Sequence, residues 1–211
     1  MEIVLTAFDE PLARAWEAHC AGLPGVSVYR GSIFDVACDA VVSPANSYGI
    51  MDGGIDALYV DRFGKTVQDR VRQAIWSRRH GELLVGEAEI VETGEPASPY
   101  LIAAPTMRVP MVLGEETVNP YLAMRAVFRL VRHGLFAEGA LAGRPVEEAV
   151  KRVAFPGMGT GVGRVPAEVC ALQMRRAIEE HAHGDFAFPT SWSEASERHQ
   201  LLYTDRPRRL Q

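Results

Sequence analysis

The stretch FPGMGTGVGRVP, residues 155–166, is the part of the chain that decides its expected fold. An apolar strand runs into a loop in which every second residue from 157 to 163 is glycine, and Pro166 is typical of a first helical turn. Alternating glycines allow positive φ values and close approach of the backbone to a ligand. Successive N–H groups can converge on an oxyanion, and a helix N-terminus adds positive potential. The stretch therefore predicts a strand–loop–helix unit that binds phosphate, and its length favours a diphosphate.

The chain lacks the motifs of three other common folds. No G-x-x-x-x-G-K-[ST] sequence occurs, so a P-loop is not expected. No G-x-G-x-x-G opens the first expected helix, which argues against a dinucleotide-dependent dehydrogenase. A G-x-S-x-G elbow is also missing, so an α/β-hydrolase triad has no support.

A second informative segment is DAVVSPANSYGIMDGGIDAL, residues 39–58. A buried strand leads to Asn46, and Gly53 and Gly54 precede Asp56 at an expected helix start. Open α/β sheets bind ligands beyond the carboxyl ends of their strands, where Asn46 would lie. Its amide suits a ribose hydroxyl. For Asp56 the residues leave two interpretations open, a carboxylate that complements the helix N-terminus or a site residue.

The rest of the chain alternates strands and helices. Strands are expected over residues 2–8, 26–30, 38–43, 86–92, 100–104 and 152–155, and helices from Asp9, Gly53, Asn119 and Pro166 as caps or first turns. Apolar residues recur every fourth position over 53–79, and Gly64 marks a kink or a break there. This order predicts an α/β fold, with a mainly parallel or mixed sheet between helices.

Length and composition limit the organisation and the location. We expect one domain over residues 1–185, with a surface insertion around 136–149 and a tail over 186–211 that packs partly on the domain. A net charge of −5 argues against a broad basic surface for nucleic acid. The three cysteines are far apart, which is typical of buried thiols in a reducing cytosol. Since neither a signal peptide nor a membrane span is recognisable, we expect a cytoplasmic protein.

Together the two segments resemble the macro domain family of ADP-ribose-binding modules. Ser43-Pro44-Ala45-Asn46 and Gly53-Gly54-Ile55-Asp56 stand where that family has N-x-A-N and a glycine cluster. Gly159 to Pro166 matches its phosphate loop, and Gly31-Ser32-Ile33 its G-D-I motif. Tyr100 to Pro105 looks like its central strand, and the match spans about residues 26–183. The resemblance implies a three-layer α-β-α macro domain with a central mixed, mostly parallel sheet.

The resemblance also implies which residues contact the ligand. They are Ser32, Ile33, Ala45, Asn46, Gly53, Gly54, Ile55, Asp56, Pro156, Gly157, Met158, Gly159, Thr160, Gly161, Val162, Gly163 and Arg164. If the protein is an enzyme, Asp56 orients or deprotonates a water and Asn46 holds the distal ribose. Such a hydrolase acts on an ADP-ribosylated side chain, an O-acetyl ester or a terminal phosphate of ADP-ribose. No metal or other cofactor is expected.

Four departures from the family pattern keep a second function open. Ser32 replaces the acid that meets adenine, and Ser43 replaces the first Asn. Gly163-Arg164 replaces an aromatic-glycine pair, and Val60 stands where hydrolytic members have histidine. These changes favour a divergent bacterial-type branch. The changes at Val60 and Gly163-Arg164 also favour a non-catalytic reader of ADP-ribose or another nucleotide.

A third function is binding of RNA or of a different phosphorylated metabolite, and the RNA alternative depends on a different part of the chain. The basic residues concerned are Arg70, Arg72, Arg78, Arg79 and His80. A solvated helix face explains such charges at least as well. We therefore expect a small diphosphate ligand, with an ADP-ribosylated macromolecule as a further partner, and neither a nucleic acid nor a membrane.

Overall fold

A computed structural model describes residues 1–208, in which six strands form one sheet. Their order is β2-β1-β6-β3-β5-β4. The strands are β1 (Glu2–Ala7), β2 (Val26–Arg30), β3 (Ala40–Ser43), β4 (Glu89–Glu92), β5 (Tyr100–Ala103) and β6 (Arg152–Phe155). Only β4, at one edge, is antiparallel to its neighbour among these strands. The expected mixed, mostly parallel sheet is confirmed.

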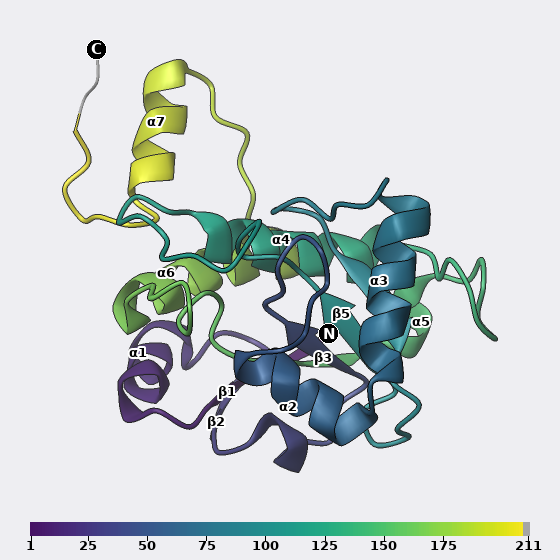
Figure 1. Cartoon of the computed structure of the whole chain (residues 1–211). Coiled ribbons are helices and arrows are strands. Elements are labelled where there is room, and N and C mark those ends of the chain that lie inside the picture. Colours follow the sequence, from purple (N-terminus) through teal and green to yellow (C-terminus); the bar gives the residue numbers. More distant parts are fainter. Residues whose placement is uncertain (209–211) are drawn as a thin grey trace.

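Helices cover both faces of this sheet (Figure 1). They are α1 (Glu10–Cys20), α2 (Gly54–Phe63), α3 (Thr66–Arg78), α4 (Asn119–His133), α5 (Val146–Ala149), α6 (Ala167–Ala177) and α7 (Trp192–Gln200), with short turns η1 (Ile33–Asp35) and η2 (Ile178–Ala182). On one face, Ile3, Leu5 and Phe155 share a core with α1, α4 and α6. On the other, Val4 and Val41 pack against α2 and α3. Successive strand residues point to opposite faces, so the fold has three layers.

The expected helix over 53–79 is two helices. Gly64, with φ +80°, ends α2, because glycine adopts this left-handed conformation without strain. The predicted apolar spacing nevertheless holds across the break, since Tyr59, Val67 and Val71 are buried in one cluster. Figure 1 shows α2 and α3 meeting at an angle on the same side of the sheet.

Two expected boundaries were wrong. The strand expected over 86–92 begins at Glu89, after Gly86 turns the chain with φ +96°. The cap of α4 is Val118, and the Asn119 amide instead donates to the carbonyl of Thr106, at 2.8 Å. This bond ties the start of α4 to the segment after β5.

The insertion and the tail each bury part of their length. Around the insertion, Phe136 and Val146 are buried, so this segment contributes to the core as well as to the surface. In the tail, α7 stands away from the sheet (Figure 1) and Trp192 is 79% exposed, whereas Leu202 is buried. No helix in the described part of the chain combines the length and apolar character that a bilayer span requires.

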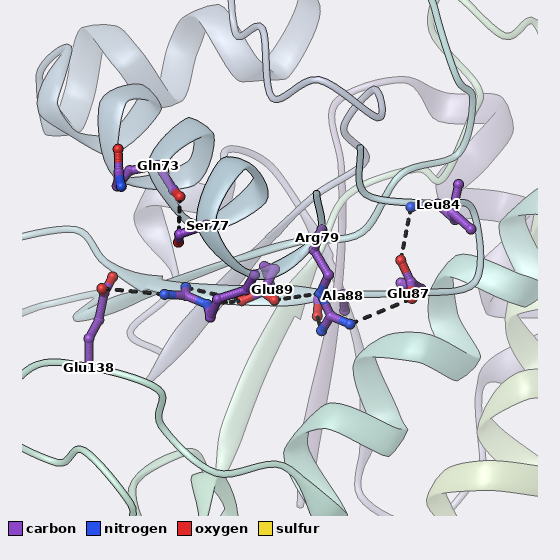
Figure 2. A network of polar contacts seen from close by, with 9 residues as sticks. Gln73, Ser77, Arg79, Leu84, Glu87, Ala88, Glu89 and Glu138 are labelled. Atoms are coloured by element: carbon purple, nitrogen blue, oxygen red, sulfur yellow. Dashed lines mark hydrogen bonds and ion pairs between the residues drawn. The ribbon is translucent and has the colours of Figure 1, made fainter. Parts of the chain in front are cut away.

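A buried carboxylate joins α3 to the edge strand β4. Glu89 is 6% exposed and pairs with both Arg78, at 3.2 Å, and Arg79, at 2.7 Å. Figure 2 shows this network, in which Glu87 and Glu138 add outer pairs. Two arginines of the basic patch considered for RNA are therefore neutralised by acids.

Candidate functional site

A cleft with a volume of about 290 Å³ opens at the carboxyl ends of the parallel strands. Segments that follow β1, β3, β5 and β6 line it, together with the start of α2. Because parallel strands bring their carboxyl ends to one edge of the sheet, loops far apart in the sequence meet there. The predicted site residues that line the cleft are Ala45, Asn46, Gly53, Gly54, Ile55, Asp56, Pro156, Gly157, Gly159, Thr160, Gly161, Val162 and Gly163.

The glycine loop lines this cleft through Gly157 and Gly159 to Gly163. The loop is closed by bonds from the N–H of Val165 to the carbonyl of Gly159, at 3.1 Å, and from Leu113 to Gly163, at 2.9 Å. The N–H groups from Gly157 to Gly163 make no hydrogen bond to another group within residues 1–208. Such a row of unengaged donors is a nest for an anion.

Neighbouring atoms approach two of the loop glycines closely, a backbone oxygen at Gly163 and side-chain atoms at Gly157. A Cβ at Gly163 would lie 2.5 Å from the carbonyl oxygen of Gly159, and one at Gly157 would lie 2.7 Å from a methyl of Leu12. At Gly161 a Cβ meets nothing within 4 Å, although the residue lines the cleft. The loop is thus packed tightly at both ends and open at its tip.

The start of α2 borders the same cleft and has no side-chain cap. Its N-cap is Gly53, which has no side chain that could bond to the first turn, and Gly54 has φ +56°. The first N–H groups of a helix have no partner inside the helix, and they carry the positive end of its dipole. A second set of donors therefore borders the cleft together with the glycine loop.

Asp56 lies in the first turn of α2 and is 7% exposed. The hydroxyl of Ser43, at the end of β3, donates to its Oδ1 at 2.6 Å. Burial raises the pKa of the Asp56 carboxyl to about 6, the Ser43 bond partly offsets this, and the nearby charge of Asp52 adds to it. Asp56 is therefore a buried and hydrogen-bonded carboxylate, not an exposed one that only complements the helix dipole.

The side chain of Asn46 organises the loop that follows β3. Its Oδ1 accepts from the N–H groups of Tyr48, at 3.1 Å, and Ile50, at 3.3 Å, while its Nδ2 donates to the carbonyl of Ile50 at 2.7 Å. An amide has two N–H donors, so one donor of Asn46 is left for a ligand hydroxyl.

Four of the predicted contact residues do not line the cleft. The hydroxyl of Ser32 accepts from the N–H of Phe34 and caps η1. Ile33 and Met158 are buried in the two cores on either side of the sheet. Arg164 is exposed, with φ +53°.

The segment after β1 joins the site, and the sequence interpretation missed it. Phe8 and Asp9 line the cleft, together with Thr6 and Ala7 at the end of β1, and Phe8 is 78% exposed. Asp9 accepts from the N–H of Leu12 through Oδ2 and caps α1, as expected. The sequence offered one signal for these residues, because Phe8 and Asp9 directly follow a strand of the same parallel sheet. Within residues 1–208 no three His, Cys, Asp or Glu side chains are grouped as metal ligands.

The sequence is similar to a known family and to proteins of several organisms. The family model described as Macro domain matches residues 42–174. An uncharacterized protein of Aquifex aeolicus is 36% identical over 156 residues, which is 74% of this chain and 81% of the relative. A protein of Pantoea vagans named O-acetyl-ADP-ribose deacetylase 2 is 29% identical over 146 residues, 69% of this chain and 76% of its own length.

Solved structures show the same fold. The macrodomain of Mycobacterium tuberculosis DarG has a TM-score of 0.57 at 20% identity, covering 72% of this chain and 88% of its own. A variant of the Oceanobacillus iheyensis macrodomain, solved with ADPR, has a TM-score of 0.55 at 18% identity, with coverage of 70% and 73%. The match to the family model extends over more than half of the sequence, and the chain belongs to the macro domain family.

Proposed function

We propose that the cleft binds ADP-ribose or a closely related derivative, with the diphosphate between the glycine loop and the start of α2. The observation that carries this proposal is the row of unengaged N–H groups from Gly157 to Gly163, beside a helix N-terminus without a side-chain cap. Backbone donors of this kind bind phosphate oxygens without any cationic side chain.

The end of β1 supports recognition of the base. The ring of Phe8 is exposed at the rim of the cleft, and base–aromatic stacking contributes roughly 1–3 kcal/mol per base. Asp9 uses Oδ2 for its cap, and Oδ1 is an acceptor for an amino group. These two residues take the role that the family pattern gives to the acid replaced by Ser32.

Hydrolysis at the distal ribose is the further step that we propose. One water is consumed: the bond between the distal ribose and its substituent is broken, the hydroxyl of the water is added to one fragment, and its proton passes by way of Asp56 to the other. Asp56 takes a proton from this water, and a carboxyl with a pKa of about 6 is suited to a general base near neutral pH. The name of the Pantoea vagans relative, O-acetyl-ADP-ribose deacetylase 2, is consistent with such a reaction.

A non-catalytic reader is the second candidate. It is favoured by the bond from Ser43, which holds Asp56 in place, and by Val60, which packs with the α2–α3 core one turn later. Incubation with O-acetyl-ADP-ribose separates the two: release of acetate and ADP-ribose supports the hydrolase, and bound but unchanged ligand supports the reader.

Replacing Gly161 by valine should weaken ADP-ribose binding by about tenfold or more, which corresponds to about 1.4 kcal/mol. The new side chain meets no protein atom near its Cβ, so it projects into the space where the loop donors meet the ligand. Calorimetric titration measures the affinity, and urea denaturation checks that stability is unchanged.

Gly114→Val is the matched control for this variant. Gly114 is exposed, a Cβ there meets nothing within 4 Å, and the residue does not line the cleft. We expect native affinity. Equal affinities of the two variants for ADP-ribose would contradict a diphosphate site at this loop.

An ADP-ribosylated macromolecule as substrate and a cytoplasmic location are also part of this proposal. For the location, the supporting observation is that Cys20, Cys38 and Cys170 are buried free thiols, as is usual in a reducing compartment.

A further inference from the structure

The charged side chains that line the cleft within the described residues are all acidic. Three aspartates, Asp9, Asp52 and Asp56, line it, and no Lys, Arg or His does so among residues 1–208. Asp9 is tied to its helix cap, and Asp56 is buried against Ser43. Asp52 is exposed and makes no hydrogen bond or ion pair within the described residues, so its charge is uncompensated.

Among the basic residues near the cleft, Arg164 follows the lining residue Gly163 but is exposed and does not itself line the cleft, and two other arginines are engaged by protein groups. Arg108 makes two bonds to the carboxylate of Glu82, at 2.6 and 3.2 Å. Arg72 donates to the carbonyl of Tyr48 at 3.2 Å. Attraction for an anion therefore comes from backbone dipoles, which hold one diphosphate but add no net positive charge.

We propose that Asp52 makes the cleft prefer an ADP-ribose derivative whose distal ribose carries an uncharged substituent over one whose distal ribose is phosphorylated. This inference rests on the proposed function, which places the distal ribose beside the Asn46–Asp56 loop. Asp52 directly precedes the glycine pair of that loop, and Asp56 follows it. The two carboxylates thus lie at the end of the ligand that varies between substrates.

The physical reason is repulsion between like charges. A phosphate monoester carries a charge of about −1.5 to −2 at neutral pH. Two carboxylates that line the same cleft therefore repel such a group, and the cleft offers no lining cation among residues 1–208 to offset the repulsion. Asp52 and Asp56 are close enough for their charges to interact, although burial is the main cause of the raised pKa of Asp56. Asp52 is thus a specificity-determining residue that favours neutral acyl or glycosidic substituents.

The test is a calorimetric titration of the full chain with two ligands, ADP-ribose and ADP-ribose phosphorylated on the anomeric carbon of its distal ribose. The native protein should bind ADP-ribose at least about tenfold more tightly. Asp52→Asn should reduce this preference several-fold. Asp61→Asn is the matched control, because Asp61 is an exposed acid of α2 that does not line the cleft, and it should leave the preference unchanged.

The outcomes separate this proposal from the function on which it rests. If ADP-ribose binds and the preference is the same in the native protein and in Asp52→Asn, the role of Asp52 is wrong and the binding function stands. Equal affinity of the native protein for both ligands also overturns it. If ADP-ribose binds to none of the three proteins, the proposed function itself fails.

Discussion

Replacing Glu89 by alanine should lower the free energy of unfolding by about 3 kcal/mol. Glu89 is buried and pairs with Arg78 and Arg79, so its removal leaves two guanidinium groups without their inner partner. We expect the lower end of the range for broken buried pairs, because both arginines are partly exposed and can turn toward water. Urea denaturation followed by tryptophan fluorescence measures the loss.

Glu138→Ala is the control for this prediction. Glu138 pairs with the same Arg78, at 3.3 Å, but its side chain is 58% exposed. Exposed ion pairs contribute about 0–1 kcal/mol, so little stability should be lost. Equal losses in the two variants would mean that Glu89 does not join α3 to β4 as described.

Replacing Asp56 by asparagine should stabilise the protein at pH 8 by up to about 3 kcal/mol. The pKa of this carboxyl is about 6 in the folded protein, against an ordinary value of 3.8. The folded state therefore holds the proton more tightly than the unfolded state, and native stability falls as the pH rises from about 4 to about 6. Asparagine carries no charge and avoids this cost.

The pH dependence of the stability difference between the two proteins tests whether the pKa of Asp56 is raised in the folded state. Unfolding free energies of the two proteins should converge below about pH 3, where the carboxyl is protonated in both states, and differ most above pH 6. A difference that is the same at pH 4 and pH 8 would contradict a raised pKa for Asp56.

The same variant also tests the chemistry. If Asp56 is the general base, turnover should fall by about a hundredfold or more while ADP-ribose affinity is kept. In the native enzyme kcat should rise with pH through about 6, as the carboxylate forms. Turnover that does not depend on Asp56 would remove it from the mechanism.

The glycine loop was predictable because its chemistry is local. Spacing of the glycines and the following Pro166 predicted a strand–loop–helix unit, and the structure has β6, the loop and α6 in that order. The segment from Asn46 to Asp56 likewise predicted Asn46 beyond a strand end and Asp56 at a helix start, and Asp56 lies in the first turn of α2. Local patterns of this kind depend on backbone conformation, which neighbouring residues determine.

Features that depend on distant segments were not predictable. Phe8 joins the site because β1 lies beside β6 in the sheet, and no local pattern gives that strand order. Burial of Asp56 depends on Ser43 and on the packing of α2 against the sheet. The Asn119–Pro120 pair had the sequence of a cap, yet the Asn119 amide bonds to the distant Thr106.

Calorimetric titration of ADP-ribose into the native full chain tests the diphosphate site most directly. We expect saturable heat with a dissociation constant in the micromolar range, because the loop from Gly157 to Gly163 and the start of α2 supply preformed donors. No heat at millimolar ligand, from protein shown to be folded by circular dichroism, would contradict the site.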